Sequence, residues 1–266
     1  MTGDEILGIA LEQSAIDSGC RPSDFLSPAG CIVVSRADPR ARRYLELPFD
    51  CDLTCYGNGI VASVAEPLVE PVRGYIERFP AVHCFETPNL LVLAEALAPF
   101  GLRVCFMASY YLPLPDLRPL PCALNVRFLT PPDLAGLYLP QWSNALCEKR
   151  RELDVLAAGA YDGDRLVGLA GCSADCERMW QIGVDVLPEY RRTGVASALT
   201  SALAARVLEL GRVPFYCCAW SNIPSARNAV RSWFRPAWVQ LTAKPEPFVR
   251  AMNEKTGGTK PAADGR

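Results

Sequence analysis

The stretch Ile182-Gly-Val-Asp-Val-Leu-Pro-Glu-Tyr-Arg-Arg-Thr-Gly-Val-Ala-Ser197 decides the fold of this 266-residue chain. Its first part is a strand sequence that ends at Pro188, because proline cannot donate a hydrogen bond to a sheet ladder. A basic, glycine-containing turn follows, and apolar residues then recur every four positions from Val195 to Val207. This pattern predicts a strand, a short turn and a long helix that begins at about Gly194.

The start of this helix is a candidate anion-binding site. A helix N-terminus has free amide donors and carries partial positive charge. Gly194 has no Cβ, so a ligand can approach the backbone closely, and Arg191 and Arg192 add full positive charge. The arrangement suits a phosphate or a pyrophosphate. An ordinary surface turn with solvated arginines fits the same local pattern.

Strands and helices flank this stretch on both sides. A hairpin is predicted across the turn Asp162-Gly163-Asp164, because two strand-like runs meet there. The strands predicted in this half of the chain cover residues 125–129, 155–161, 165–172, 179–187, 213–220 and 237–243. A helix is predicted over residues 225–234.

The first half of the chain has an α/β pattern of its own. Thr2 and Glu5 form a capping box for a first helix, and Asn58-Gly59 supplies a hairpin turn. Strands are predicted at residues 31–35 and 102–112, a strand, turn and strand at residues 53–64, and helices at residues 66–78 and 89–99. The fold class is therefore α/β (α+β).

A proline-rich run separates the two halves. Four prolines fall between residues 113 and 121, and such a run cannot be a helix or a central strand. It is typical of an extended connector between domains, although a loop within one domain has the same composition. We therefore predict an N-terminal domain at residues 1–118, a second domain at residues 122–250 and a flexible tail at residues 251–266.

The pattern Val186-x-Pro188-x-x-Arg191-x-x-Gly194-x-Ala196 resembles the signature of the GNAT superfamily of N-acetyltransferases. In that family R/Q-x-x-G-x-G/A wraps the pyrophosphate of acetyl-CoA. The order of strands and helices agrees over roughly residues 125–250, and residues 143–150, 171–176 and 218–223 are similar to a bacterial group with an extra N-terminal domain. The resemblance implies a mixed central sheet flanked by helices, preceded by a smaller α/β domain.

The resemblance also implies that acetyl-CoA is the cosubstrate. In the family the strand before the signature gives main-chain hydrogen bonds to the pantetheine arm, and the turn amides take the pyrophosphate. Asn222 opens the next helix, where it lies near the cofactor arm or acts simply as an N-cap. The candidate cofactor-binding residues are Val184, Asp185, Val186, Arg191, Arg192, Thr193, Gly194, Val195, Ala196, Ser197 and Asn222.

Two positions depart from the family pattern. Many relatives have a tyrosine that protonates the leaving thiolate seven residues after the asparagine, and here that position is Ala229. The Gly-Phe pair that commonly ends this segment is Trp233-Phe234. Tyr216, Ser225 or a water molecule are the replacement candidates for the acid.

The general base is an open assignment. Some relatives carry a glutamate early on the strand before the signature, and the matching position here is Trp180. Glu177 is the nearest carboxylate, with Asp175 close by, so Glu177 is the candidate catalytic residue. A solvent-exposed acid in a hairpin turn is the alternative interpretation of Glu177.

The cysteine and histidine residues argue against metal binding and nucleophilic catalysis. The twelve cysteines of this chain include Cys51-x3-Cys55 and Cys172-x3-Cys176, but neither pair has CxxC spacing. We expect reduced thiols and no metal, with a zinc module as the alternative. A nucleophilic dyad would need His83, the one histidine of the sequence, beside Cys84.

Composition excludes several classes of protein. The net charge of −2 argues against a nucleic-acid partner bound through bulk positive charge. No apolar run is long enough to cross a membrane, and acidic residues stand where a secretory signal would be basic, so we expect a cytoplasmic protein.

The sequence therefore predicts an acetyl-CoA-dependent N-acetyltransferase that acts on a primary amine of a small molecule or peptide. A non-catalytic acyl-CoA-binding or sensing protein on the same scaffold is the alternative, because the usual tyrosine is missing.

Overall fold

The computed structural model describes residues 1–257, which form two compact units. The first unit comprises residues 1–17, 37–46 and 108–239, and the second comprises residues 18–36, 47–107 and 240–257. The boundary predicted near residues 118–122 does not coincide with this division. Two N-terminal segments pack with the later part of the chain, which local sequence patterns do not reveal.

The first unit is built on a mixed sheet. Its strands have the order β10-β4-β9-β8-β7-β6-β5, in which β8 and β9 are parallel, whereas β5 to β8 form antiparallel pairs. The strands are β4 (Leu102–Pro113), β5 (Asn125–Leu129), β6 (Asp154–Asp162), β7 (Arg165–Ser173), β8 (Met179–Val186), β9 (Val213–Ala219) and β10 (Phe234–Pro245). The helices are α1 (Gly3–Ser18), α4 (Pro131–Leu134), α5 (Val195–Glu209) and α6 (Ile223–Arg231).

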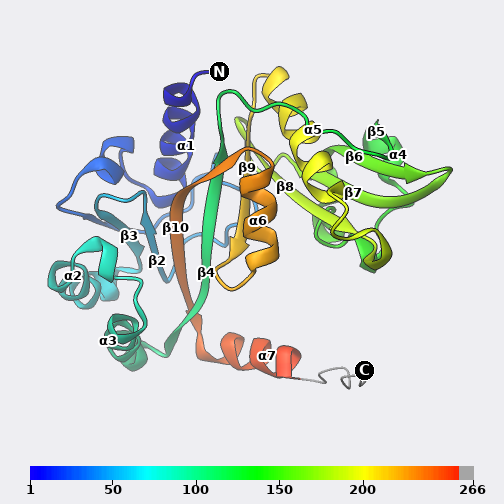
Figure 1. Cartoon of the computed structure of the whole chain (residues 1–266). Coiled ribbons are helices and arrows are strands. Elements are labelled where there is room, and N and C mark those ends of the chain that lie inside the picture. Colours follow the sequence, from blue (N-terminus) through cyan, green and yellow to red (C-terminus); the bar gives the residue numbers. More distant parts are fainter. Residues whose placement is uncertain (258–266) are drawn as a thin grey trace. The chain divides into compact units, whose positions relative to one another are not determined.

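The two faces of this sheet are covered by different segments. Figure 1 shows α5, in yellow, along β6, β7 and β8, which it contacts. Its buried Val195, Leu199 and Leu203 pack with Ile182 of β8 in one apolar cluster. A second apolar cluster contains Trp142 and its neighbours in the connection between α4 and β6. Because neighbouring strand residues point to opposite faces, β8 presents alternate side chains to these two layers.

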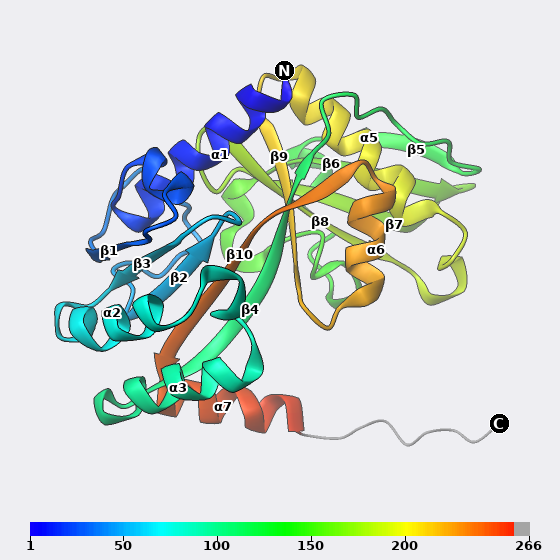
Figure 2. The same cartoon turned by 60° about the vertical axis from the view of Figure 1, so that its left-hand side comes forward.

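The second unit contains three strands that pair with one another. Strand β3 (Ile60–Val64) pairs with β1 (Cys31–Val34) in parallel and with β2 (Cys51–Cys55) antiparallel. Helices α2 (Val69–Arg78) and α3 (Thr87–Leu97) pack together, and α2 contacts β1 and β3 (Figure 2). The last helix within residues 1–257 is α7 (Glu246–Gly257). The α/β character that the sequence predicts for both halves is confirmed.

Helix ends follow local chemistry where the sequence signals are strong. The predicted capping box is present, since the Thr2 amide donates to Glu5 Oε2 at 2.7 Å and the Glu5 amide donates to Thr2 Oγ1 at 3.2 Å. The helix predicted over residues 225–234 ends earlier, at Arg231. Trp233 has φ of 67°, a left-handed conformation that stops a helix, and β10 begins at once.

The predicted tail at residues 251–266 differs in part from the structure. Residues 251–257 continue α7, and residues 258–266 lie outside the described part of the chain.

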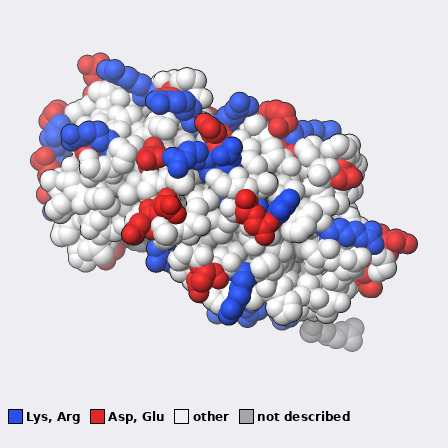
Figure 3. Space-filling view, turned by 90° about the horizontal axis from the view of Figure 1, so that it is seen from above, with Lys and Arg blue, Asp and Glu red and all other residues white. Residues whose placement is uncertain are grey.

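Acidic and basic side chains are interspersed on the face shown in Figure 3. This mixture agrees with the net charge of −2 and gives that face no extended field of a single sign. Within residues 1–257, no helix combines the length and the apolar character that spanning a bilayer requires.

Candidate functional site

A cleft of about 1080 Å³ lies in the first unit where β8 and β9 separate. The two strands pair only over Met179–Gln181 of β8, and from there to Val186 the described residues give β8 no ladder partner on its β9 side. Both residues 181–186 of β8 and residues 216–218 of β9 line the cleft. The open strand edge therefore offers main-chain donors and acceptors to a ligand that lies along it.

The turn after β8 leads to the N-terminus of α5 at one end of this cleft. Arg191 Nε donates to the carbonyl oxygen of Val186 at 3.0 Å, and Thr193 Oγ1 donates to the carbonyl oxygen of Tyr190 at 2.7 Å. Arg192 and Gly194 both have left-handed backbone, with φ of 64° and 90°. These bonds and torsions fix the direction in which α5 begins.

The first turn of α5 is open to a ligand. Gly194 is the N-cap and has no side chain to cap the helix, so the amides of Val195, Ala196 and Ser197 have no intrahelical acceptor. A Cβ added at Gly194 would meet no atom within 4 Å. The amides, the helix dipole and the two exposed arginines of the turn together form a site that suits a pyrophosphate.

Every candidate cofactor-binding residue except Thr193 lines this cleft. Thr193 instead uses its hydroxyl within the turn. Asn222 both lines the cleft and caps α6, since its Oδ1 accepts a hydrogen bond from the Ser225 amide at 3.2 Å. The structure thus brings together the strand, the turn and the helix start that the sequence singled out.

Asp185 contributes its main chain to the cleft, but its carboxylate is engaged elsewhere. Asp185 Oδ2 accepts from the amides of Asn144 and Ala145 at 2.8 and 3.0 Å, and Oδ1 accepts from Asn144 Nδ2 at 2.6 Å. Because these bonds use both carboxylate oxygens, the side chain holds the loop before β6 and is not directed to an anionic ligand.

Two hydroxyl groups lie on the opposite wall. Tyr216 Oη and Ser225 Oγ are 2.8 Å apart, and both residues line the cleft. Burial raises the pKa of Tyr216 above its usual value, so this phenol is protonated at neutral pH. Ala229, at the position where the family resemblance would put a tyrosine, is completely buried.

Comparison with known proteins agrees with this geometry. The model of the acetyltransferase (GNAT) family matches residues 124–231. The chain carries a GNAT acetyltransferase domain. No curated protein matches the chain.

The solved structures that match the chain share little sequence with it. An acetyltransferase of the GNAT family from Colwellia psychrerythraea is 15% identical, with a TM-score of 0.42, over 56% of this chain and 61% of that one. A GCN5-related N-acetyltransferase-like protein from Streptococcus suis is 17% identical, with a TM-score of 0.43, over 59% and 68%. An aminoglycoside N-acetyltransferase in complex with CoA is 19% identical, with a TM-score of 0.34, over 45% and 92%. The chain therefore spans about two thirds of the length of the first two proteins.

The candidate base does not lie in the cleft of the GNAT domain. Glu177 is exposed in the loop between β7 and β8 and is not among the lining residues. Asp175 is fully buried, and its Oδ1 lies 3.6 Å from Arg150 Nε. Burial raises the pKa of the Asp175 carboxyl, which also does not line the cleft. Glu177 is close to the signature in the sequence, but the loop exposes its side chain outside the cleft.

Several lining residues were not singled out by the sequence. They are Asn144, Gln181, Tyr190, Cys217, Arg227, Asn228 and Arg231. Gln181 Nε2 donates to Cys217 Sγ at 3.1 Å, and burial raises the pKa of Cys217 to about 11, so this thiol is a weak nucleophile. The i,i+4 spacing of Arg227 and Arg231 on α6 was the one signal available from the sequence.

The other chemical alternatives involve no residue that lines the cleft. Within residues 1–257, no cluster of three or more histidine, cysteine and acidic residues could hold a metal ion. His83 Nδ1 lies 2.8 Å from Glu86 Oε1 on an exposed surface, whereas Cys84 is buried and donates its thiol to the Phe79 carbonyl oxygen at 3.5 Å. His83 therefore pairs with a glutamate and not with its neighbouring thiol.

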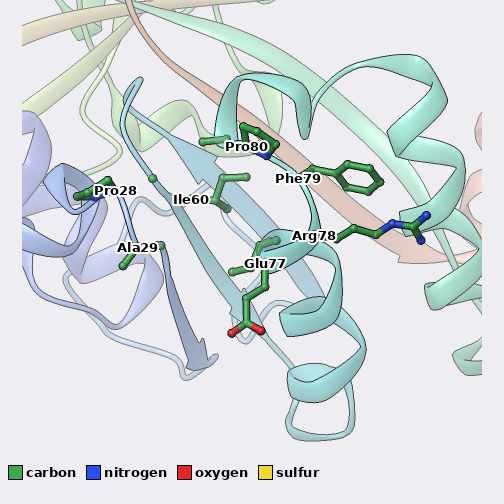
Figure 4. A pocket seen from close by; sticks show the side chains of 11 residues that line it. Pro28, Ala29, Ile60, Glu77, Arg78, Phe79 and Pro80 are labelled. Carbon is green, nitrogen blue, oxygen red and sulfur yellow. The ribbon is translucent and has the colours of Figure 1, made fainter.

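The second unit has a smaller pocket of about 410 Å³, shown in Figure 4. Its wall consists of Pro28, Ala29, Ile60, Pro80 and other mostly apolar residues. The labelled side chains of Glu77 and Arg78 extend in different directions (Figure 4), so they do not form a converging polar site. This pocket offers no recognisable chemistry.

Proposed function

We propose that the chain is an acetyl-CoA-dependent N-acetyltransferase that acetylates a primary amine of a small molecule or peptide. One observation carries the proposal. The unpaired edge of β8 runs toward the uncapped, arginine-flanked start of α5, and both line a single cleft. A ligand with an amide-containing arm and a pyrophosphate is complementary to this combination.

The donor would lie with its pantetheine amides along Val184, Asp185 and Val186. Its pyrophosphate would accept hydrogen bonds from the amides of residues 192–197, with charge from Arg191 and Arg192. Gly194 is suited to this role because it leaves open space above the backbone.

The chemistry is a direct transfer. The lone pair of the neutral amine attacks the thioester carbonyl carbon, and a C–N bond forms. The C–S bond then breaks, CoA leaves as a thiolate, and the nitrogen loses one proton. Main-chain amides at the open edge of β8 would stabilise the negative charge that develops on the carbonyl oxygen.

The proton transfers would use groups on the wall of the cleft and solvent. Tyr216, which lines the cleft and is hydrogen-bonded to Ser225, would protonate the leaving thiolate. Glu177 is exposed outside the lining, so a water molecule or the neutral fraction of the amine itself is the better supported route for the amine proton.

Calorimetry with acetyl-CoA and turnover assays on primary amines would test this proposal together. The expected result is acetyl-CoA binding and release of free CoA thiol that depends on an added amine. Tight binding without turnover on a broad panel of amines would instead support an acyl-CoA-binding or sensing protein, a role favoured by Ala229. Absence of binding would contradict both roles.

A further inference from the structure

The segment from Trp142 to Cys147 is held against the face of the sheet opposite to α5. Trp142, Ala145 and Leu146 are buried in the apolar cluster on that face, whereas Asn144 between them is exposed. Cys147 is fixed as well, since its amide donates to Asp154 Oδ2 at 2.9 Å. The segment is therefore anchored on both sides of Asn144.

Two glycines allow this segment to touch the strands directly. A Cβ on Gly183 would collide with the carbonyl oxygen of Asn144, and a Cβ on Gly171 would collide with that of Ala145. Both glycines lie on paired positions of β7 and β8. The backbone of Asn144 therefore rests on the same strand whose free edge lines the cleft.

Asp185 fixes the orientation of the Asn144 side chain. Since Asn144 Nδ2 donates to Asp185 Oδ1 at 2.6 Å, the amide group cannot rotate without losing this bond. Asn144 lines the cleft, and among the residues 1–257 its Oδ1 has no hydrogen-bond partner. An amide oxygen with a fixed direction is thus available for a donor that enters the cleft.

The two ligands of a transfer reaction would reach β8 from different faces. The start of α5, which suits the pyrophosphate, lies on one face of the sheet, and Asn144 lies on the other. Acetyl-CoA bound at the start of α5 would therefore leave the face of the sheet that carries Asn144 free for the acceptor amine.

We propose that Asn144 Oδ1 binds an N–H of the acceptor amine, and that Asp185 is a positioning residue that orients Asn144. This inference rests on the proposed function. It assigns the acceptor side of the cleft to a residue outside the acetyl-CoA signature, and it requires an acceptor with a free N–H.

A pair of small analogues tests the inference without knowledge of the natural acceptor. In S-(N-methylcarbamoylmethyl)-CoA, an amide N–H stands near the place of the attacking amine. In S-(N,N-dimethylcarbamoylmethyl)-CoA, a methyl group replaces that hydrogen. Calorimetry should show that the wild-type protein prefers the N–H analogue by roughly five- to tenfold, the range expected for one neutral hydrogen bond.

Substitutions then test which residues cause the preference for the N–H analogue. Asn144→Ala and Asp185→Asn should both reduce the preference to less than about twofold, below the effect of one hydrogen bond. Asn125→Ala, an exposed asparagine at the start of β5, should keep the wild-type preference. Should Asp185→Asn fail to fold, Asn144→Ala still decides the result.

Each outcome separates this inference from the proposed function. If CoA itself does not bind to the wild-type protein, the proposed function fails. If CoA binds but the wild-type protein does not distinguish the analogues, or Asn144→Ala still does, the assignment of Asn144 is wrong.

Discussion

The hydroxyl oxygens of Tyr216 and Ser225 lie 2.8 Å apart on the wall of the cleft. Tyr216 comes from β9 and Ser225 from the first turn of α6, so their contact joins the two elements that face the open edge of β8. Ala229, one turn further along α6, brings no hydroxyl. The phenol on the wall of the cleft is therefore that of Tyr216 on β9, whereas α6 has Ala229 at the position where many relatives have a tyrosine.

Tyr216→Phe should lower kcat by roughly ten- to a hundredfold, around the lower end of general-acid contributions, because a thiolate is a fair leaving group. Stopped assays with the best amine would measure this. Because burial raises the pKa of Tyr216, its proton is lost only above the usual range of tyrosine, so the wild-type profile should show no limb from it between about pH 7 and 9. Tyr111→Phe, at a buried tyrosine outside the cleft lining, is the matched control. A loss under threefold in Tyr216→Phe would leave water as the acid.

Gly194→Val should weaken acetyl-CoA binding at least tenfold, or about 1.4 kcal/mol, because the new side chain would occupy the space over the helix amides. Gly211→Val is a matched control, since Gly211 also has positive φ, 73° against 90°, and also has no neighbour within 4 Å of an added Cβ. Both variants place a valine at a positive φ, but only Gly194 lines the cleft. Equal acetyl-CoA affinities in the two folded variants would rule out the pyrophosphate assignment.

Glu177→Gln should change kcat/KM by less than about threefold, well below the loss of a hundredfold or more expected for a general base. The reason is its exposure in the loop between β7 and β8, outside the cleft lining. A pH–rate profile of the variant should match that of the wild-type protein. A large loss with unchanged acetyl-CoA affinity would restore Glu177 as the base and would require the loop to move.

Asp154 should make stability depend on pH. Burial raises the pKa of its carboxyl to about 6, although the Cys147 amide donates to it. An acid whose pKa is raised by folding destabilises the protein in its charged form, so this contribution grows as the pH rises from about 4 to 6 and is then constant. Its size is on the order of 3 kcal/mol.

Denaturation of the wild-type protein and of Asp154→Asn between pH 4 and 7 would measure the effect. The wild-type stability should fall relative to the variant as the pH rises to about 6, since asparagine keeps an acceptor without the charge. A constant difference between the two proteins over this range would contradict the raised pKa.

The features predicted correctly from the sequence are those that depend on residues close together in the chain. The glycine and the apolar repeat were sufficient to place the start of α5, and Asn58-Gly59 was sufficient for the β2–β3 hairpin. The hydrogen bond between Asn144 and Asp185 was missed because the two residues are 41 positions apart. Nothing in the local pattern of either residue records that bond. The direction of Glu177 was missed for a related reason, since the sequence locates a loop without its orientation.

The residues that make up the first unit are likewise determined by contacts between positions far apart in the sequence. Arg42 is 2% exposed and pairs with Asp17, whose Oδ2 lies 3.3 Å from Arg42 Nη1. The Arg42 guanidinium also lies 5.0 Å from the ring centroid of Phe215 and 5.3 Å from that of Trp238. These N-terminal residues therefore cover aromatic side chains that belong to β9 and β10.

A fragment of residues 122–250 tests whether the predicted second domain is independent. The fragment lacks α1, residues 37–46 and β4, and it would expose Phe215 and Trp238 to water. We therefore expect it to be insoluble or unfolded, while the full chain binds acetyl-CoA under the same conditions. Circular dichroism and calorimetry on both proteins would decide this. Adding residues 1–121 as a separate chain should restore solubility if the missing segments supply the cover. A soluble fragment that binds acetyl-CoA on its own would instead support the boundary predicted from the proline run and would make the N-terminal segments dispensable for the site.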